Sequence, residues 1–116
     1  MIKRPLLLVA LPLAFFAVPG LTCEYPARIE VPDGKTATED NMIAGQQAVK
    51  GYISAMEEYL DCIDKETESL VSDGDEKAEK EQRAILVSKH NAAVDEMETI
   101  ADAFNEQVRA YKAANE

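Results

Sequence analysis

The 116-residue sequence has no tryptophan, one histidine and two cysteines, and no proline follows Pro32. So short a chain with so few aromatic residues has little material to enclose a small-molecule pocket. Its apolar run near the N-terminus contains Pro12 and is shorter than the roughly 20 residues that span a bilayer. It also has no glycine-rich phosphate loop and no evident pair of nucleophile and base. We therefore expect a non-enzymatic protein without a cofactor.

The N-terminal segment has the order of a secretory signal. A short basic start precedes an uncharged apolar run, and small or turn-forming residues follow this run up to Cys23. This order is typical of signal peptides that are removed on export. We expect residues 1–22 to be a signal peptide and the protein to be periplasmic or secreted. Cleavage after Gly20 and cleavage after Thr22 both place small residues where they are required.

Lipidation of Cys23 is the alternative fate of this N-terminus. A bacterial lipoprotein signal favours leucine three residues before the cysteine, but Gly20 occupies that place and Leu21 lies one step out of register. The chain also has no basic patch to reinforce a lipid anchor on a membrane. Cleavage without lipid is therefore the preferred prediction, and a lipid anchor through Cys23 is the minor alternative.

Acidic residues dominate the exported chain. Removal of Lys3 and Arg4 lowers the 12 basic residues to ten, while all 22 acidic residues remain, so the net charge is near −12. This charge disfavours binding to nucleic acid and to anionic lipid surfaces. Solubility explains the charge most simply, and a cationic partner would also suit it.

The two cysteines, Cys23 and Cys62, are an even set for an oxidising compartment. They allow one intramolecular pairing, and neither belongs to a Cys-x-x-Cys redox motif. Residues 23–37 form an irregular arm, because they contain two prolines and a turn signal at Asp33-Gly34, with a short strand conceivable at residues 28–31. Extended, the arm is long enough to turn back and place Cys23 on Cys62.

Residues 38–114 carry two amphipathic helical patterns that are separated by a break. We expect the first helix over residues 39–71 and the second over residues 75–113. The break at residues 72–75 contains Gly74, and its aspartates can cap the second helix. Two long amphipathic helices joined by a short loop bury their apolar stripes only when they are antiparallel. The predicted fold is therefore all-α, an antiparallel two-helix hairpin of coiled-coil type with a disulfide-tethered N-terminal arm.

The first helix carries two further expectations. Thr36 and Thr38 are both good N-caps, and Thr36 with Glu39 has the spacing of a capping box. A groove of small side chains should lie beneath the arm, and its members are Ala44, Ala48, Gly51, Ala55 and Cys62. Because glycine costs about 1 kcal/mol of helix propensity relative to alanine, we expect a packing role for Gly51. Alternatively, the alanines are ordinary helix formers that face the second helix.

The candidate functional residues are few. Tyr52, Tyr59 and Tyr111 either mark a partner surface, where tyrosine is enriched, or line the edge of the core. His90 is either a boundary residue or a switch and metal ligand. No Glu-x-x-His pair and no calcium-loop spacing occur, so we assign no metal site. We expect a periplasmic interaction module that binds a protein or a second copy of itself. The alternative is a metal-binding or pH-responsive protein that uses His90 and nearby carboxylates.

Four short segments stand out in the exported chain, namely Cys23-Glu24-Tyr25-Pro26, Pro32-Asp33-Gly34, Tyr59-Leu60-Asp61-Cys62 and His90-Asn91-Ala92-Ala93. With these segments the chain resembles small exported helical proteins of Gram-negative bacteria. The resemblance covers most of the exported chain. It implies a helical exported domain, and it provides no activity, cofactor or site residue.

Mass spectrometry of the non-reduced, exported protein tests both the processing and the pairing. We expect the chain to start at Leu21 or Cys23, and a proteolytic digest to contain a peptide pair that joins Cys23 to Cys62. The same digest after reduction is the control, because the linked pair should then separate. A free thiol on Cys62, or a lipid on Cys23, would contradict the prediction.

Overall fold

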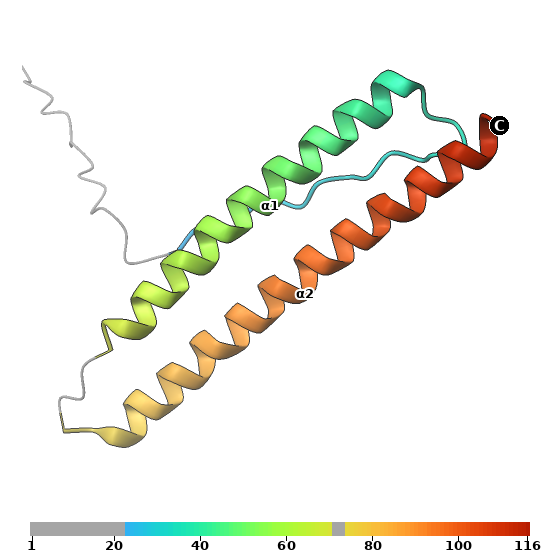
Figure 1. The fold of residues 1–116 in the computed structure, drawn as a ribbon. Helices are drawn as coiled ribbons and strands as arrows, with labels where there is room; N and C mark the ends of the chain where they lie inside the picture. The colour runs from blue at the N-terminus through green and yellow to red at the C-terminus, as the bar shows by residue number, and fades with distance from the viewer. Residues whose placement is uncertain (1–22, 71–73) are drawn as a thin grey trace, which may run out of the picture.

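The computed structural model describes residues 23–70 and 74–116, so the expected signal peptide at residues 1–22 lies outside the described residues. The described chain is all-α, with two helices, α1 (Glu39–Glu68) and α2 (Glu76–Ala114). They lie side by side and antiparallel, and the arm that precedes α1 runs along the pair (Figure 1). The predicted hairpin with its disulfide-tethered arm is confirmed.

The start of α1 is set by a reciprocal pair of hydrogen bonds. The Thr38 hydroxyl accepts from the Asn41 backbone N–H at 3.1 Å, and Asn41 Oδ1 accepts from the Thr38 N–H at 3.2 Å. Thr38 is therefore the N-cap, and the predicted box of Thr36 with Glu39 is wrong. Thr36 instead lies in a turn, where its N–H donates to the Asp33 carbonyl. This turn reverses the arm just before the helix begins.

α1 ends at Glu68, three residues before the expected end at residue 71. The Ser69 hydroxyl donates to the Glu66 carbonyl, and the Thr67 hydroxyl donates to the Ile63 carbonyl, each at 2.9 Å. The Glu66 carbonyl is one of the last four, which have no helical N–H donor, so the Ser69 hydroxyl supplies a donor that a continuing helix would have provided. The Thr67 bond to Ile63 is an ordinary contact one turn back within the helix.

α2 begins one residue later and ends one residue later than expected, at Glu76 and Ala114. The Asp75 carboxylate accepts from the Ala78 N–H at 3.1 Å and caps the helix. Before it, Gly74 has a φ of 88°, a conformation that favours glycine. The turn signal in the sequence thus marks the correct break between the helices.

The hydrophobic core is a single seam between the helices. The buried side chains come at steps of three, four and seven residues, as the amphipathic patterns predict. In α1 they are Met42, Val49, Tyr52, Met56, Tyr59 and Ile63, and in α2 they are Leu86, Ala93, Ile100 and Phe104. Complete burial of one large apolar side chain contributes about 1.5–3 kcal/mol, so this seam is the main stabilising element of the hairpin.

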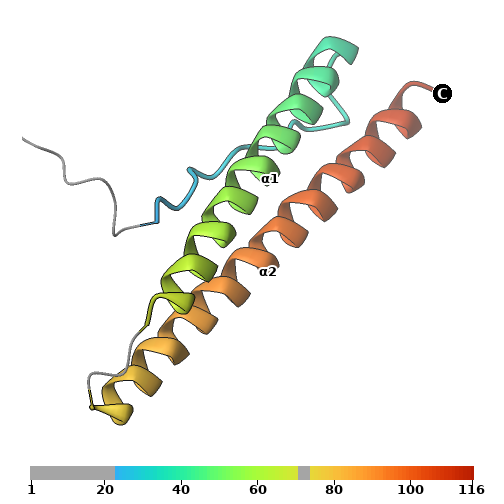
Figure 2. The same cartoon turned by 60° about the vertical axis from the view of Figure 1, so that its left-hand side comes forward.

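The arm packs against both helices on one side of the seam (Figure 2). The Gly34 N–H donates to Oε1 of Gln107 in α2 at 2.9 Å. A Cβ atom on Gly34 would overlap the Gln107 carbonyl, so only glycine allows this close approach. Ile29 and Val31 are half-buried against the core, in an extended segment that forms no strand in the described residues. The arm is thus a third layer on the two helices.

The groove expected beneath the arm is only partly present, because Ala55 and Cys62 are half-buried whereas Ala44 and Ala48 are exposed beside the arm. Ala44 and Ala48 line a hollow together with arm residues 30–33, and Ala55 lines another beside Tyr25. The packing role expected for Gly51 is wrong, because nothing lies within 4 Å of the place its Cβ would occupy. The arm contacts α1 at a different glycine.

Gly45 contacts the arm and Gly51 does not, so the two glycines of α1 provide a matched test of the arm's position. A Cβ at Gly45 would lie 2.7 Å from Pro32 and 3.2 Å from Phe104, whereas one at Gly51 would enter open space. We expect Gly45→Ala to lower the free energy of unfolding by about 1–3 kcal/mol through overpacking. Gly51→Ala should raise it by about 0.5–1 kcal/mol through helix propensity. Denaturant unfolding measures both, and equal effects would contradict the arm's position.

Candidate functional site

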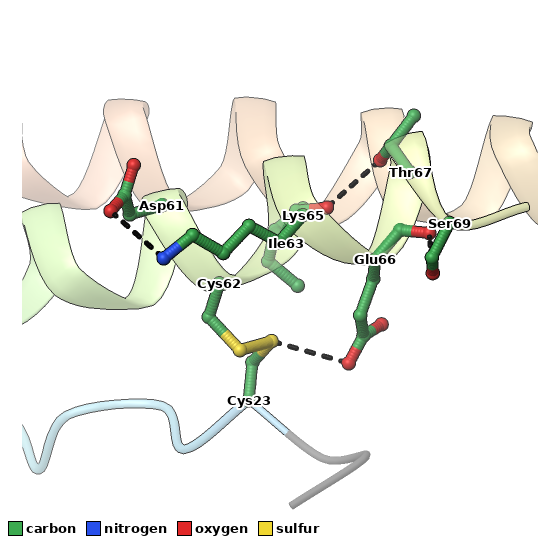
Figure 3. The surroundings of a disulfide bond; sticks show 8 residues. All are labelled: Cys23, Asp61, Cys62, Ile63, Lys65, Glu66, Thr67 and Ser69. Carbon is green, nitrogen blue, oxygen red and sulfur yellow. Dashed lines mark hydrogen bonds and ion pairs between the residues drawn. A yellow bond between two sulfur atoms is a disulfide. The ribbon is translucent and has the colours of Figure 1, made fainter.

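The disulfide between Cys23 and Cys62 joins the start of the arm to α1. The Cα atoms are 5.6 Å apart, and the bond closes a loop with a sequence separation of 39 residues. A loop of this size stabilises the fold by on the order of 4 kcal/mol in the chain-entropy description. The bond holds the arm beside the C-terminal half of α1 (Figure 3).

A carboxylate lies against this bond. Oε1 of Glu66 is 3.2 Å from Sγ of Cys23, and Figure 3 shows the side chain reaching toward the sulfur atoms. A disulfide sulfur carries no proton, so Cys23 donates no hydrogen bond in this contact. Glu66, Cys23 and Cys62 place ligand atoms within 4.8 Å of one another. In the oxidised pair, however, neither sulfur is the thiolate that binds a metal.

Two of the three tyrosines predicted for a partner surface belong to the core. Tyr52 is 4% exposed and Tyr59 is 7% exposed, so neither is available to a partner, and for them that prediction is wrong. Tyr59 instead supports the arm, because its ring meets Tyr25 edge-on with centroids 5.0 Å apart. Tyr111 is half-buried in a hollow between the helices and stays a candidate.

Burial also controls the chemistry of these tyrosines. Desolvation raises the pKa of Tyr52 and of Tyr59, and the neighbouring Tyr25 raises both further. The Tyr52 hydroxyl has no hydrogen-bond partner of good geometry among the described residues. Both hydroxyls are therefore neutral at neutral pH. Because the pKa is raised on folding, their contribution to stability is present below pH 10 and is lost as the pH rises through the folded-state pKa.

His90 lies at the boundary between core and solvent. Its Nε2 is 3.8 Å from Oδ1 of Asp64 across the two helices, beside Ile63 and Leu86. No group of three metal-ligating side chains in the described part of the chain includes His90. The alternative of a metal-binding or pH-responsive role therefore stays a prediction that rests on this one histidine–carboxylate pair.

The side of the hairpin opposite the arm contains two shallow hollows that are lined by both helices and by no arm residue. One, of about 180 Å³, lies at the N-terminal end of α1, and the other, of about 150 Å³, lies near the loop. Ile43 in the first is 47% exposed, and Val87 in the second is 51% exposed. Each hollow thus displays a large apolar side chain to solvent.

Half-buried apolar side chains connect the two hollows. We call the whole surface the open face, and it consists of Ile43, Ile53, Leu60, Val87, Val94, Met97, Ala101 and Val108. Its α2 row repeats at seven-residue steps, Val87, Val94, Ala101 and Val108, immediately after the buried row of Leu86, Ala93 and Ile100. The seven-residue spacing in the sequence is the signal that separates the two rows, although the predicted amphipathic pattern of this helix combined them.

No protein family, curated protein or solved structure matches this chain. Similarity therefore assigns no function and no site residue. Within the described residues, neither helix is both long and apolar enough to cross a membrane.

Replacement of Glu66 tests what its carboxylate does to the disulfide. A negative charge beside the sulfur repels an attacking thiolate and disfavours the thiolate that leaves, so Glu66→Gln should speed reduction severalfold. The rate is followed with glutathione, an anionic thiol, and with cysteamine, a cationic one. The acceleration should be larger with glutathione. Glu57→Gln, an exposed change on another face of the same helix, is the control, and an unchanged rate in Glu66→Gln would contradict the prediction.

Proposed function

We propose that this protein is an exported, non-enzymatic helical module that binds another polypeptide through the open face. One observation carries the proposal, namely the second apolar row of α2, from Val87 to Val108, which the arm leaves uncovered. Single exposed apolar residues are ordinary on protein surfaces. Here they recur as a regular row beside half-buried apolar residues of a second helix, and extended apolar surfaces are typical of interaction sites.

The shape of the open face favours a polypeptide over a small ligand. Its hollows are shallow, of about 180 and 150 Å³, and lie at opposite ends of the hairpin. Small-molecule sites enclose their ligand in one cavity of roughly 300–1,000 Å³. A long apolar strip between two helices instead suits an amphipathic helix laid along it. The strip therefore supports helix binding.

Two features support export. The disulfide is consistent with an oxidising compartment, since such bonds are rare where thiols are kept reduced. The first 22 residues have the order of a signal peptide. We therefore propose a periplasmic or secreted location, with a lipid anchor at Cys23 as the minor alternative. In either case, the arm is tethered at the start of the exported chain.

The absence of an enzymatic role is part of the proposal. The lone histidine, His90, shares a hollow with Asp64, Thr67 and apolar side chains, and the Thr67 hydroxyl donates to the Ile63 carbonyl rather than to His90. The disulfide uses both cysteines, so neither is a free nucleophile. These environments support a binding role rather than catalysis.

Two neighbouring residues of equal exposure test the proposed function. Val87 is 51% exposed on the open face, and Ile85 is 49% exposed away from the two hollows of that face. A photo-crosslinking amino acid at position 87 of the exported chain should form adducts with a polypeptide, because that surface is covered in the complex. The same group at position 85 should form few. Equal yields from both positions, or none from either, would remove the proposal.

A further inference from the structure

We infer that the polypeptide that covers the open face is a second copy of this chain, so that two hairpins form a four-helix bundle. This inference rests on the proposed function and names its partner. Each copy contributes one apolar face, and the arm occupies the opposite side of each hairpin. An assembly of two copies therefore covers both open faces and leaves none for a third.

The size of the open face suits a stable dimer. α1 contains 30 residues and is thus about 45 Å long, and α2 is longer. Two helices packed 8–10 Å apart present a strip roughly 18 Å wide. Their joint face is therefore about 800 Å², which is the area that each partner contributes to a standard interface. No additional segment is needed to reach that area.

The edges of the open face carry opposite charges at the same height along the hairpin. Gln46 shares a hollow with Phe104, and Ile63 shares one with Val87. These two pairs show which residues of α1 and α2 lie at the same position along the hairpin axis. By that correspondence Lys50 on the α1 edge lies level with Glu98 on the α2 edge. Both side chains are exposed. Within one copy they lie on opposite edges of the open face.

A twofold axis parallel to the helices brings these edges together. It places α1 of one copy against α2 of the other, with the loops of both hairpins at the same end of the bundle. Every neighbouring pair of helices is then antiparallel, as in bundles with short loops. Lys50 then meets Glu98 of the second copy, and the symmetry makes this contact twice. Glu39 and Lys112, level with each other at the N-terminal end of α1, form a second such pair. Each copy therefore carries both halves of the required charge pattern.

Other occupants fit this surface less well. The net charge of the exported chain, near −12, repels an anionic membrane and a second copy alike, so it does not distinguish them. A membrane surface, however, offers no fixed opposite charges at the positions of Lys50 and Glu98, whereas a second copy does. A foreign helix would need to supply the charges that a second copy already places opposite Lys50 and Glu98. Charge complementarity at the edges therefore favours self-association, since like charges brought together would oppose it.

Sedimentation equilibrium of the exported, oxidised chain tests the dimer. We expect a dimer at micromolar concentration, and Val94→Glu should make it monomeric by placing a charge in the interface. Lys50→Glu and Glu98→Lys alone should each raise the dissociation constant roughly tenfold, because each brings like charges together twice. The double reversal should restore the original constant. Ile85→Glu is the matched control and should leave the dimer unchanged.

Circular dichroism of each variant establishes that the helices persist, and the charge variants alter only exposed side chains. The inference is overturned if the chain remains monomeric at about 100 µM, roughly a hundredfold above the expected micromolar dissociation constant of the dimer. A dimer that Val94→Glu leaves intact, or a double reversal as weak as the single changes, overturns it as well. If the chain is monomeric but position 87 crosslinks to a different protein, self-association fails while the proposed function stands.

Discussion

The disulfide between Cys23 and Cys62 determines which side of the hairpin is covered. A two-helix hairpin buries one seam and leaves apolar side chains at both of its edges. The bond holds one end of the arm against α1, and the Thr38 cap holds the other end at the start of the helix. Between these fixed points the arm contributes only partly buried side chains such as Ile29 and Val31. Without the bond, their burial would have to offset the ordering entropy of the whole arm.

The path of the arm explains details of composition that would otherwise have no reason. Gly34 and Gly45 are places where its backbone or its proline approaches a helix too closely for a side chain. The Tyr25 ring packs edge-on against Tyr59, and Nε of Arg28 lies 3.4 Å from Oε1 of Glu96. That exposed ion pair contributes little energy, but it joins the arm to α2 on the same side as Gly34. One face is thereby completed by the chain itself.

The uncovered face follows from the same constraint. Because the arm lies on one side, the row from Val87 to Val108 has no arm residue packed on it within the described chain. Its apolar side chains therefore stay partly exposed to solvent. Tyr52 and Tyr59, which by residue type suit an interface, instead fill the seam, and Tyr59 also packs against the arm. The proposed binding therefore rests on aliphatic residues of a regular helical surface, with charged residues at its edges.

Helical periodicity and a single pair of cysteines are enough to predict an all-α hairpin with a tethered arm, because both are local or combinatorial properties of the chain. The choice of Thr38 over Thr36 as cap, of Gly45 over Gly51 as contact, and of buried over exposed tyrosines depends on where the arm lies. Adjacent rows of one helix differ by only about 100° of rotation, so a single helix pattern cannot tell which edge is covered. Only the packed position of the arm separates the buried edge from the open face.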